Sequence, residues 1–442
     1  LLGGSGGAGG QGGVVNVESQ GNISTEGNFA NGILAQSIGG GGGAGGYIHD
    51  DFYGFTKPVS SMELGIAVGG NGGDGGDVTV ENSGDITTHG GFAHGILAQS
   101  IGGGGGFGGI SENLGWSILQ GLLYNGVSAQ NTGFGVGFAG SAGGLGSAGA
   151  VSVTHTGNIT THGDMSHGIL AQSAAGTGTA GAGPVTVTLA SDITANGMNS
   201  DGIHAQSVGG SGSGNISINI GGGTVRGGLG TGAGVNIDGG AINTLTNDGS
   251  ISALSGLSII GDVGNDTVYN NGIVTGSVDL GEGVNAFNNN LTGTFNSGAF
   301  VNLGAGNTLT NDGVFSPGGS GSVLETIIAC DFIQSASGLL NLEIGGFDAG
   351  EYDLLNITET ASLGGNINFS FLSGYDIVTD VGPGETLELC FLNAGLIDGF
   401  GSTIAYNFCS LPFFQFDVFK MDNSVYFQAT NKVPLPGAVL LG

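Results

Sequence analysis

Short alternations of apolar and polar residues recur along the first half of the chain. Each begins with a Val-x-Val pair, continues through a single Ile, and ends in a Gly-Ile step followed closely by Gln-Ser. Four such segments align without a gap, at residues 15–38, 78–101, 151–174 and 185–208. Apolar residues at every second position are typical of β-strands, and Asn- and Gly-rich steps between the runs are typical of turns. Each segment therefore predicts three short strands.

A segment of this size cannot bury its own apolar face, but stacked copies share one continuous core. We therefore predict an all-β solenoid in which each segment makes one coil of three strands. A looser series of repeats continues the stack, starting at Asn243, Asp266, Asn285 and Asn307. The predicted solenoid spans residues 1–320, with inserts at 39–77 and 102–150.

The composition and the alternation pattern of the sequence change after residue 322. Glycine becomes rarer, and Phe, Leu and Cys become more frequent in longer alternating runs. We expect residues 323–431 to form a smaller C-terminal β domain or cap, because an open solenoid end exposes unpaired strand edges. Residues 432–442 begin a more hydrophobic segment.

Glycine-rich tracts flank both inserts, at residues 39–46, 69–76, 102–109 and 139–149. Glycine lacks a Cβ, which lets the chain leave a coil sharply and lets two backbones approach closely. Two interpretations are open. The tracts are flexible stems, or they are extended polyglycine helices that pack against one another or against neighbouring molecules.

Stacking places equivalent residues roughly 4.8 Å apart, so the alignment predicts columns of like side chains. Columns of amides stabilise stacked strands through hydrogen bonds along the stacking axis. We expect such a column at Gln36, Gln99, Gln172 and Gln206. A column of hydroxyls is expected beside it, at Ser37, Ser100, Ser173 and Ser207.

Metal ions are the only cofactors for which the sequence offers candidates. The alignment places His89 over His162 and His94 over His167, and two imidazoles one coil apart can share a transition-metal ion. The alternative is that exposed turns accept any polar residue. The stretch GDVGNDTVY is similar to one copy of the Ca²⁺-binding Gly- and Asp-rich repeats, and its candidate ligands are Asp262, Asn265 and Asp266. Solvated turn residues are the alternative there.

The excess of acidic residues limits the classes of partner that the protein can bind. The chain carries 34 acidic and 4 basic residues among 442. Such a surface repels phosphate backbones and anionic lipid headgroups, so nucleic acid is excluded as a partner. No apolar run in the chain reaches the roughly 18 residues that a membrane span requires. Neither a GxSxG nor an HExxH motif occurs, and we do not expect an enzyme.

The three cysteines lie in the last quarter of the chain. No CxxC pair and no cysteine–histidine cluster of zinc spacing occurs. The plain interpretation is one disulfide and one free thiol, and we favour Cys390 with Cys409 in an oxidising compartment.

The motif GNITTHG…HGILAQS, the glycine tracts and residues 264–322 resemble the passenger regions of autotransporter-type surface proteins. The resemblance implies a right-handed parallel β-helix exposed outside a Gram-negative cell. The stretch VPLPGAVLLG resembles the start of a PEP-CTERM exosortase sorting signal and implies export to the envelope or extracellular matrix. The residues that carry this second resemblance are Val433, Pro434, Leu435 and Pro436.

These features together predict a structural extracellular protein that assembles with identical copies into a filament, sheath or biofilm matrix. Exopolysaccharide is a further candidate partner. The alternative is a monomeric surface adhesin or glycan-binding protein. Apolar residues in the inserts are the candidates for assembly contacts. They are Tyr47, Phe52, Tyr53, Phe55, Trp116, Leu119, Leu122 and Leu123.

Overall fold

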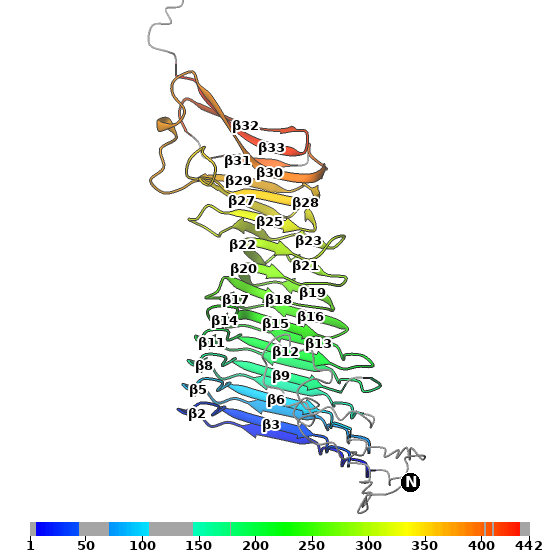
Figure 1. Cartoon of the computed structure of the whole chain (residues 1–442). Helices are drawn as coiled ribbons and strands as arrows, with labels where there is room; N and C mark the ends of the chain where they lie inside the picture. The colour runs from blue at the N-terminus through cyan, green and yellow to red at the C-terminus, as the bar shows by residue number, and fades with distance from the viewer. Residues whose placement is uncertain are drawn as a thin grey trace, which may run out of the picture.

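The computed structural model describes residues 6–43, 70–105, 145–176, 178–401, 404–408 and 411–433. Within these residues the chain forms 33 strands and one short 3-10 helix, Ile377–Thr379. The strands wind into an elongated stack that rises from an N-terminal coil to a C-terminal hairpin (Figure 1). None of the described segments is a helix with the length and apolarity needed to cross a membrane.

The first four coils are the four segments aligned in the sequence. Every strand pairs in parallel with its equivalent one coil further on, without a shift in register. Coils one and two consist of β1 (Val15–Ser19), β2 (Ile23–Thr25), β3 (Ile33–Ile38), β4 (Val78–Asn82), β5 (Ile86–Thr88) and β6 (Ile96–Ile101). Coils three and four consist of β7 (Val151–His155), β8 (Ile159–Thr161), β9 (Ile169–Ala174), β10 (Val185–Leu189), β11 (Ile193–Ala195) and β12 (Ile203–Val208). The predicted parallel β-solenoid with three strands per coil is confirmed.

A fifth coil follows that the sequence alignment did not identify. It consists of β13 (Ile216–Ile220), β14 (Thr224–Gly227) and β15 (Ala233–Gly239), which pair with β10, β11 and β12. This coil has Ile-Ser-Ile where the others have a Val-x-Val pair, and Val-Asn-Ile-Asp-Gly where the others have Ile-x-Ala-Gln-Ser. Loss of the most recognisable part of the motif concealed the repeat.

The second series of repeats then follows in register. Asn243 pairs with Asp266, and the next two repeats continue the same column. The strands are β16 (Ile242–Asn247), β17 (Ser250–Ala253), β18 (Leu257–Ile260), β19 (Asn265–Asn270), β20 (Ile273–Asp279), β21 (Ala286–Asn289), β22 (Thr294–Asn302), β23 (Thr308–Asn311), β24 (Val314–Pro317) and β25 (Glu325–Ala329). β20 and β22 each continue through a corner of the coil, so each pairs with strands of two columns.

The parallel stack does not end at residue 320, so the boundary expected there is corrected to about residue 408. All three columns of strands continue in parallel beyond it. The strands are β26 (Asp331–Gln334), β27 (Leu339–Ile344), β28 (Leu354–Ser362), β29 (Asn366–Phe371), β30 (Thr386–Asp398) and β31 (Ala405–Phe408). Glycine becomes rarer in this region because β28 and β30 pass through a corner without a glycine-rich turn.

The cap expected at the C-terminal end is an antiparallel hairpin. β32 (Phe414–Met421) and β33 (Ser424–Asn431) pair with each other, and β33 also pairs with β30 in antiparallel direction. This reversal of strand direction ends the parallel repeat. At the opposite end, β1, β2 and β3 pair on one side only within the described residues.

One apolar core runs through the whole stack. Side chains of Val, Ile and Ala fill the first coils, and Phe side chains enter from the eighth coil onward. Phe287, Phe295, Phe315 and Phe332 are fully buried, and the centroids of neighbouring rings lie between 4.7 and 5.6 Å apart. Burial of this continuous column is the main term that stabilises the stack.

The described glycine-rich segments 6–13, 39–43, 70–76, 102–105 and 145–149, called the glycine arms below, hydrogen-bond to one another, and their contacts recur every three residues. The N–H groups of Gly40 and Gly43 donate to the carbonyls of Gly10 and Gly7, and Gly73 N–H donates to Gly40 O. This period and the extended backbone match left-handed helices with three residues per turn. Of the two interpretations left open by the sequence, the described parts of the arms follow the packed polyglycine helices.

Candidate functional site

The aligned glutamines form a single column of hydrogen-bonded amides. Gln36 Nε2 donates to Gln99 Oε1 (2.5 Å), Gln99 donates to Gln172 (2.7 Å), and Gln172 donates to Gln206. Gln206 in turn donates to the carboxylate of Asp238, the equivalent residue of the fifth coil. All four amides point the same way, so Gln36 Oε1 is the acceptor end of the column.

The serine beside each glutamine joins its strand to glycine backbone. Ser37 Oγ donates to Gly13 O (2.7 Å) and accepts the N–H of Gly76 (2.8 Å). Ser100, Ser173 and Ser207 make equivalent hydrogen bonds to backbone groups of Gly149, Gly183 and Gly214, the glycines that precede β7, β10 and β13. The serines therefore form the expected column, but they bond to glycine backbone and not to one another.

A second column of amides lies inside the stack, and the sequence analysis did not assign it. Asn247, Asn270 and Asn289 each donate Nδ2 to the next asparagine, and Asn311 donates to Gln334 Oε1 (2.7 Å). All five side chains are buried. The pattern that could have revealed this column is the Asn at the fifth position of each repeat in the second series.

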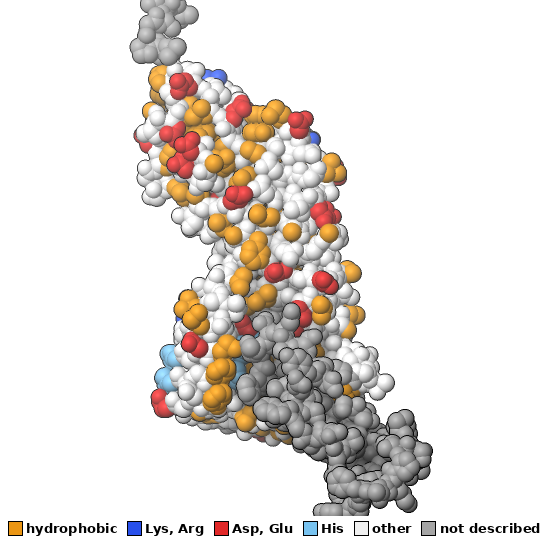
Figure 2. Space-filling model, in the orientation of Figure 1, with side chains coloured by type: hydrophobic (Ala, Val, Ile, Leu, Met, Phe, Trp, Pro, Cys, Tyr) orange, Lys and Arg blue, Asp and Glu red, His pale blue; other side chains and the backbone are white. Residues whose placement is uncertain are grey.

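His89 and His162 stack at an outer corner of the stack, with ring centroids 4.8 Å apart. His89 Nδ1 lies 3.3 Å from Glu26 Oε1, and both side chains are exposed. Within the described residues, these three side chains do not form a group of three metal ligands. Histidine side chains gather near the N-terminal end of the molecule, next to hydrophobic ones (Figure 2).

His94 and His167 also stack, with ring centroids 5.1 Å apart, and they belong to a column of hydrogen-bond acceptors. Each member accepts the backbone N–H of its equivalent in the next coil, in the order Asn31, His94, His167 and Asp201. An imidazole that accepts a hydrogen bond through Nδ1 is neutral. Burial and the neighbouring imidazoles of His167 and His204 lower the pKa of His94 to about 3, which agrees with that hydrogen bonding.

His204 joins this column to two carboxylates, and the sequence analysis missed it. His204 Nδ1 lies 2.9 Å from Asp201 Oδ2, and its Nε2 lies 3.7 Å from Asp238 Oδ2. His167 Nδ1 lies 3.3 Å from the same oxygen of Asp201. The contact was missed because the alignment compares equivalent positions, whereas His204 and Asp201 are neighbours within one coil.

The electrostatics of this cluster are set by burial and by the contacts between its carboxylates and imidazoles. Burial opposes a charged His204, but the carboxylates of Asp201 and Asp238 outweigh it and raise the pKa of His204 to about 9. Burial likewise opposes the charged form of Asp201, but His167 and His204 hold the pKa of its carboxyl well below the usual range. The carboxylates of Asp201 and Asp238 therefore face the imidazolium of His204 at neutral pH.

The residues suggested as Ca²⁺ ligands use most of their oxygens within the stack. Asp262 Oδ1 and Asn265 Oδ1 each accept a backbone N–H from a neighbouring coil, at 2.6 and 2.9 Å. Asp266 Oδ1 accepts Asn243 Nδ2 (2.7 Å), and its buried Oδ2 has no protein partner. Burial raises the pKa of Asp266 to about 6. Calcium binding here stays a prediction.

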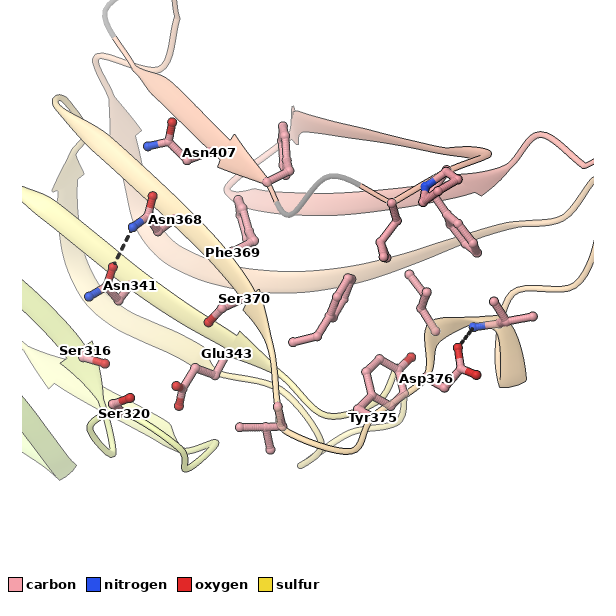
Figure 3. A pocket seen from close by; sticks show the side chains of 18 residues that line it. Ser316, Ser320, Asn341, Glu343, Asn368, Phe369, Ser370, Tyr375, Asp376 and Asn407 are labelled. Atoms are coloured by element: carbon pink, nitrogen blue, oxygen red, sulfur yellow. Dashed lines mark hydrogen bonds between the residues drawn. The ribbon is translucent and has the colours of Figure 1, made fainter.

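A cleft of about 930 Å³ opens beside the last coils and the hairpin. The amides of Asn341, Asn368 and Asn407 lie in a row across adjacent strands, and Asn368 Nδ2 donates to Asn341 Oδ1 at 3.1 Å (Figure 3). Aromatic residues share the wall, among them Tyr375 and Phe414. Aromatic faces next to rows of amides suit a ligand that offers both apolar faces and hydroxyl groups.

The first coil exposes apolar residues whose equivalents in the next coil are covered. Ile23 is half-buried, whereas Ile86 is buried. Ile38 is 54% exposed, whereas Ile101 is 8% exposed. Val15 and Val17 on β1 are likewise less buried than their equivalents on β4.

The first coil also offers backbone groups at its outer edge. Val15 N–H donates to Asp77 O (2.9 Å), toward the second coil. Successive residues of a strand direct their N–H groups to opposite sides, so the N–H of Asn16 points away from the second coil. Such a row of edge groups is a template for pairing with another strand.

Several predicted site residues lie outside the described residues. They are the eight apolar insert residues Tyr47, Phe52, Tyr53, Phe55, Trp116, Leu119, Leu122 and Leu123, together with Cys409, Pro434, Leu435 and Pro436. Cys390 is a free cysteine whose thiol donates to Asn393 Oδ1 (3.1 Å), and its pairing with Cys409 stays a prediction. Val433 N–H donates to Asn431 Oδ1 (3.0 Å).

No family model and no curated protein matches this chain. The basis for assigning a function is therefore the geometry of the stack. Three features of the described residues stand apart from its regular repeat: the first coil, whose strands pair on one side only, the His–Asp cluster and the C-terminal cleft.

Proposed function

We propose that this protein is an exported structural subunit that assembles end to end with identical copies into an extracellular filament, sheath or biofilm matrix of a Gram-negative bacterium. The observation that carries the proposal is the open first coil. Its strands pair on one side only within the described residues, and its apolar residues are those that a further coil covers elsewhere in the stack. No catalytic role is part of the proposal.

The C-terminal end of the stack supports head-to-tail assembly, because it differs from the first coil. Within the described residues β31 pairs only with β29, and β32 pairs only with β33. The two ends of the molecule are therefore different surfaces that each carry strands with a single partner. A contact between unlike surfaces that does not close on itself generates an open fibre.

The acidic composition supports an assembly that depends on these ends. The formal net charge of −30 makes two molecules repel each other, which disfavours unspecific association. Contact at the first coil places its exposed apolar residues, such as Ile38, between two copies.

The experiment that tests the proposal removes one edge donor from the first coil. Asn16→Pro deletes an N–H that points away from β4 and leaves the N–H of Val15, which pairs with the second coil, in place. Proline is tolerated on an edge strand for this reason. Asn16→Ala is the matched control, because it changes the side chain and keeps the N–H.

Assembly is measured by sedimentation velocity and light scattering over a concentration series. We expect the wild type and Asn16→Ala to form species that grow with concentration, and Asn16→Pro to remain smaller at equal concentration. Circular dichroism and thermal unfolding establish that both variants keep the fold. Equal assembly of Asn16→Pro and Asn16→Ala would contradict a role for the edge of the first coil.

The C-terminal cleft favours a second candidate function, the binding of a glycan. The specific observation is that the row of amides from Asn341 to Asn407 and the ring of Tyr375 line the same cleft. Affinity electrophoresis in gels that contain neutral or acidic polysaccharides tests it. Retarded migration that is lost in Tyr375→Ala supports this function, and unchanged migration of the wild type in every gel rejects it.

A further inference from the structure

We infer that His167, Asp201 and His204 form a binding site for a transition-metal ion of the Zn²⁺ class, which joins the third and fourth coils of the stack. Histidine nitrogen and carboxylate oxygen are the ligand types that such ions prefer. Within the described residues, this is the one place where three side chains of metal-ligating type bring their ligand atoms within 4.8 Å of one another. The inference is independent of how copies of the chain assemble.

The distances in the cluster are close to those of a tetrahedral site. A Zn²⁺ ion with ligand bonds of about 2.0–2.2 Å places its ligand atoms about 3.3 Å apart. His167 Nδ1 and Asp201 Oδ2 are already 3.3 Å apart, and Asp201 Oδ2 and His204 Nδ1 are 2.9 Å apart. Two of the three distances are thus near the tetrahedral value, and the remaining pair, His167 and His204, has its ligand atoms within 4.8 Å.

Burial makes the cluster a defined site and not a chance meeting of surface groups. The side chains of His167, Asp201 and His204 are 11%, 5% and 17% exposed. The backbone holds two of them firmly, because His167 and Asp201 accept N–H groups from adjacent coils. Coordination by His167 Nδ1 would exchange its hydrogen bond from Asp201 N–H for a bond to the metal.

The local charge also favours a divalent cation. Asp238 adds a second carboxylate, 3.7 Å from His204 Nε2. Arg226 is the one basic side chain of the described residues before Lys420, and its guanidinium donates to Asn196. A divalent ion would bring two positive charges to the two carboxylates of Asp201 and Asp238.

The position of His204 is specific to the fourth coil. The equivalent residues of the first three coils are Leu34, Leu97 and Leu170, and the fifth coil has Asn236. His204→Leu therefore restores the residue that fits this strand position in three other coils. It removes one ligand and keeps a residue type that this strand position accepts in those coils, which makes it the main test variant.

The test uses the full chain, stripped of metal with a chelator and then dialysed against buffered Zn²⁺. Bound zinc is measured by plasma mass spectrometry, and thermal unfolding is followed by calorimetry. We expect about one Zn²⁺ per wild-type chain and a rise in Tm on binding. Replacement of Zn²⁺ by Co²⁺ is expected to give the visible absorption of a tetrahedral cobalt site.

The variants decide where the ion binds. His204→Leu and Asp201→Asn are expected to lower the affinity for Zn²⁺ by about tenfold or more and to abolish the cobalt absorption. The double variant His89→Asn, His162→Asn removes the exposed pair of imidazoles and is the matched control, expected to bind like the wild type. Zinc binding that survives His204→Leu, that is lost in the control, or that is absent from the wild type would overturn the inference.

Discussion

Replacement of Gly73 by alanine tests whether the glycine arms contribute to stability as packed helices. A Cβ built on Gly73 lies 2.0 Å from the carbonyl oxygen of Gly10, whereas one built on Gly10 has nothing within 4 Å. Gly73→Ala and Gly10→Ala therefore make the same chemical change on two arms that touch each other. Neither glycine has a positive φ, so the two variants differ in packing and not in backbone strain.

The expected magnitude follows from the contacts that must separate. An ordinary contact for a Cβ begins near 3.4 Å, so the arms must move apart by more than an ångström at Gly73. Such a shift breaks the hydrogen bonds that join these two arms, from Gly9 N–H to Asn71 O (2.6 Å) and from Gly12 N–H to Asp74 O (2.7 Å). At about 1 kcal/mol each, the loss is about 2 kcal/mol. Gly10→Ala is expected to be neutral or to stabilise by about 0.5 kcal/mol through the unfolded chain.

Hydrogen exchange measured by mass spectrometry is the suitable assay, because the arms can open without unfolding of the whole stack. We expect peptides that cover residues 6–13 and 39–43 to exchange about 30-fold faster in Gly73→Ala, the factor that corresponds to about 2 kcal/mol. Gly10→Ala is expected to match the wild type. Equal exchange in the two variants would refute the packed arrangement of the arms.

Three further predictions concern the interior of the stack and its charge. Burial lowers the pKa of His155 to about 4, below the ordinary 6.5, so the unfolded state binds more protons between these values and stability falls as the pH falls through that window. His155→Leu introduces the residue found at the equivalent position of the next coil, Leu189. Measured by urea unfolding, the decrease in the free energy of unfolding from pH 7 to pH 4 should be about 3 kcal/mol smaller in this variant than in the wild type. An unchanged pH dependence would contradict this. Phe295→Ala should cost about 3–5 kcal/mol in the same assay, because its ring is fully buried between Phe287 and Phe315, and a cost below about 1 kcal/mol would contradict that packing. Added NaCl should accelerate assembly by screening the repulsion between acidic chains, and slower growth in light scattering at higher salt would contradict the proposed end contact.

The parallel stack was predictable because its repeats are short and its equivalent residues coincide in register. The Val-x-Val pair, the lone Ile and the Gly-Ile step each occupy one strand, so a single gapless alignment defines a whole coil. The column of Gln36, Gln99, Gln172 and Gln206 followed from the same alignment. Side chains that repeat in sequence are thus placed correctly wherever one coil lies directly over the next.

The features that were missed are those in which the repeat changes while the strand pairing persists. The fifth coil lost the Ala-Gln-Ser step but kept its apolar positions. Beyond residue 320 the corners are formed by continuous strands such as β28, so the turn residues that mark a coil disappear. The change in composition predicted a new domain, although the parallel strand pairing along the stack continues through this region.

The His–Asp cluster could not be predicted from the sequence, for a related reason. Column alignment compares residues between coils and predicted the stacking of His94 over His167. The decisive contact joins His204 to Asp201 within one coil, across the Gly-Ile step. Its geometry depends on where a strand begins after a turn, and periodicity alone does not determine that.

Electron microscopy of the purified chain over a concentration series tests the central claim, end-to-end assembly, most directly. One column of the stack contains twelve strands, from β2 to β31, so a subunit is about 55 Å long at about 4.8 Å per coil. We predict unbranched filaments that lengthen with concentration and repeat along the axis at about this length. Isolated rods of one subunit at every concentration would contradict the claim.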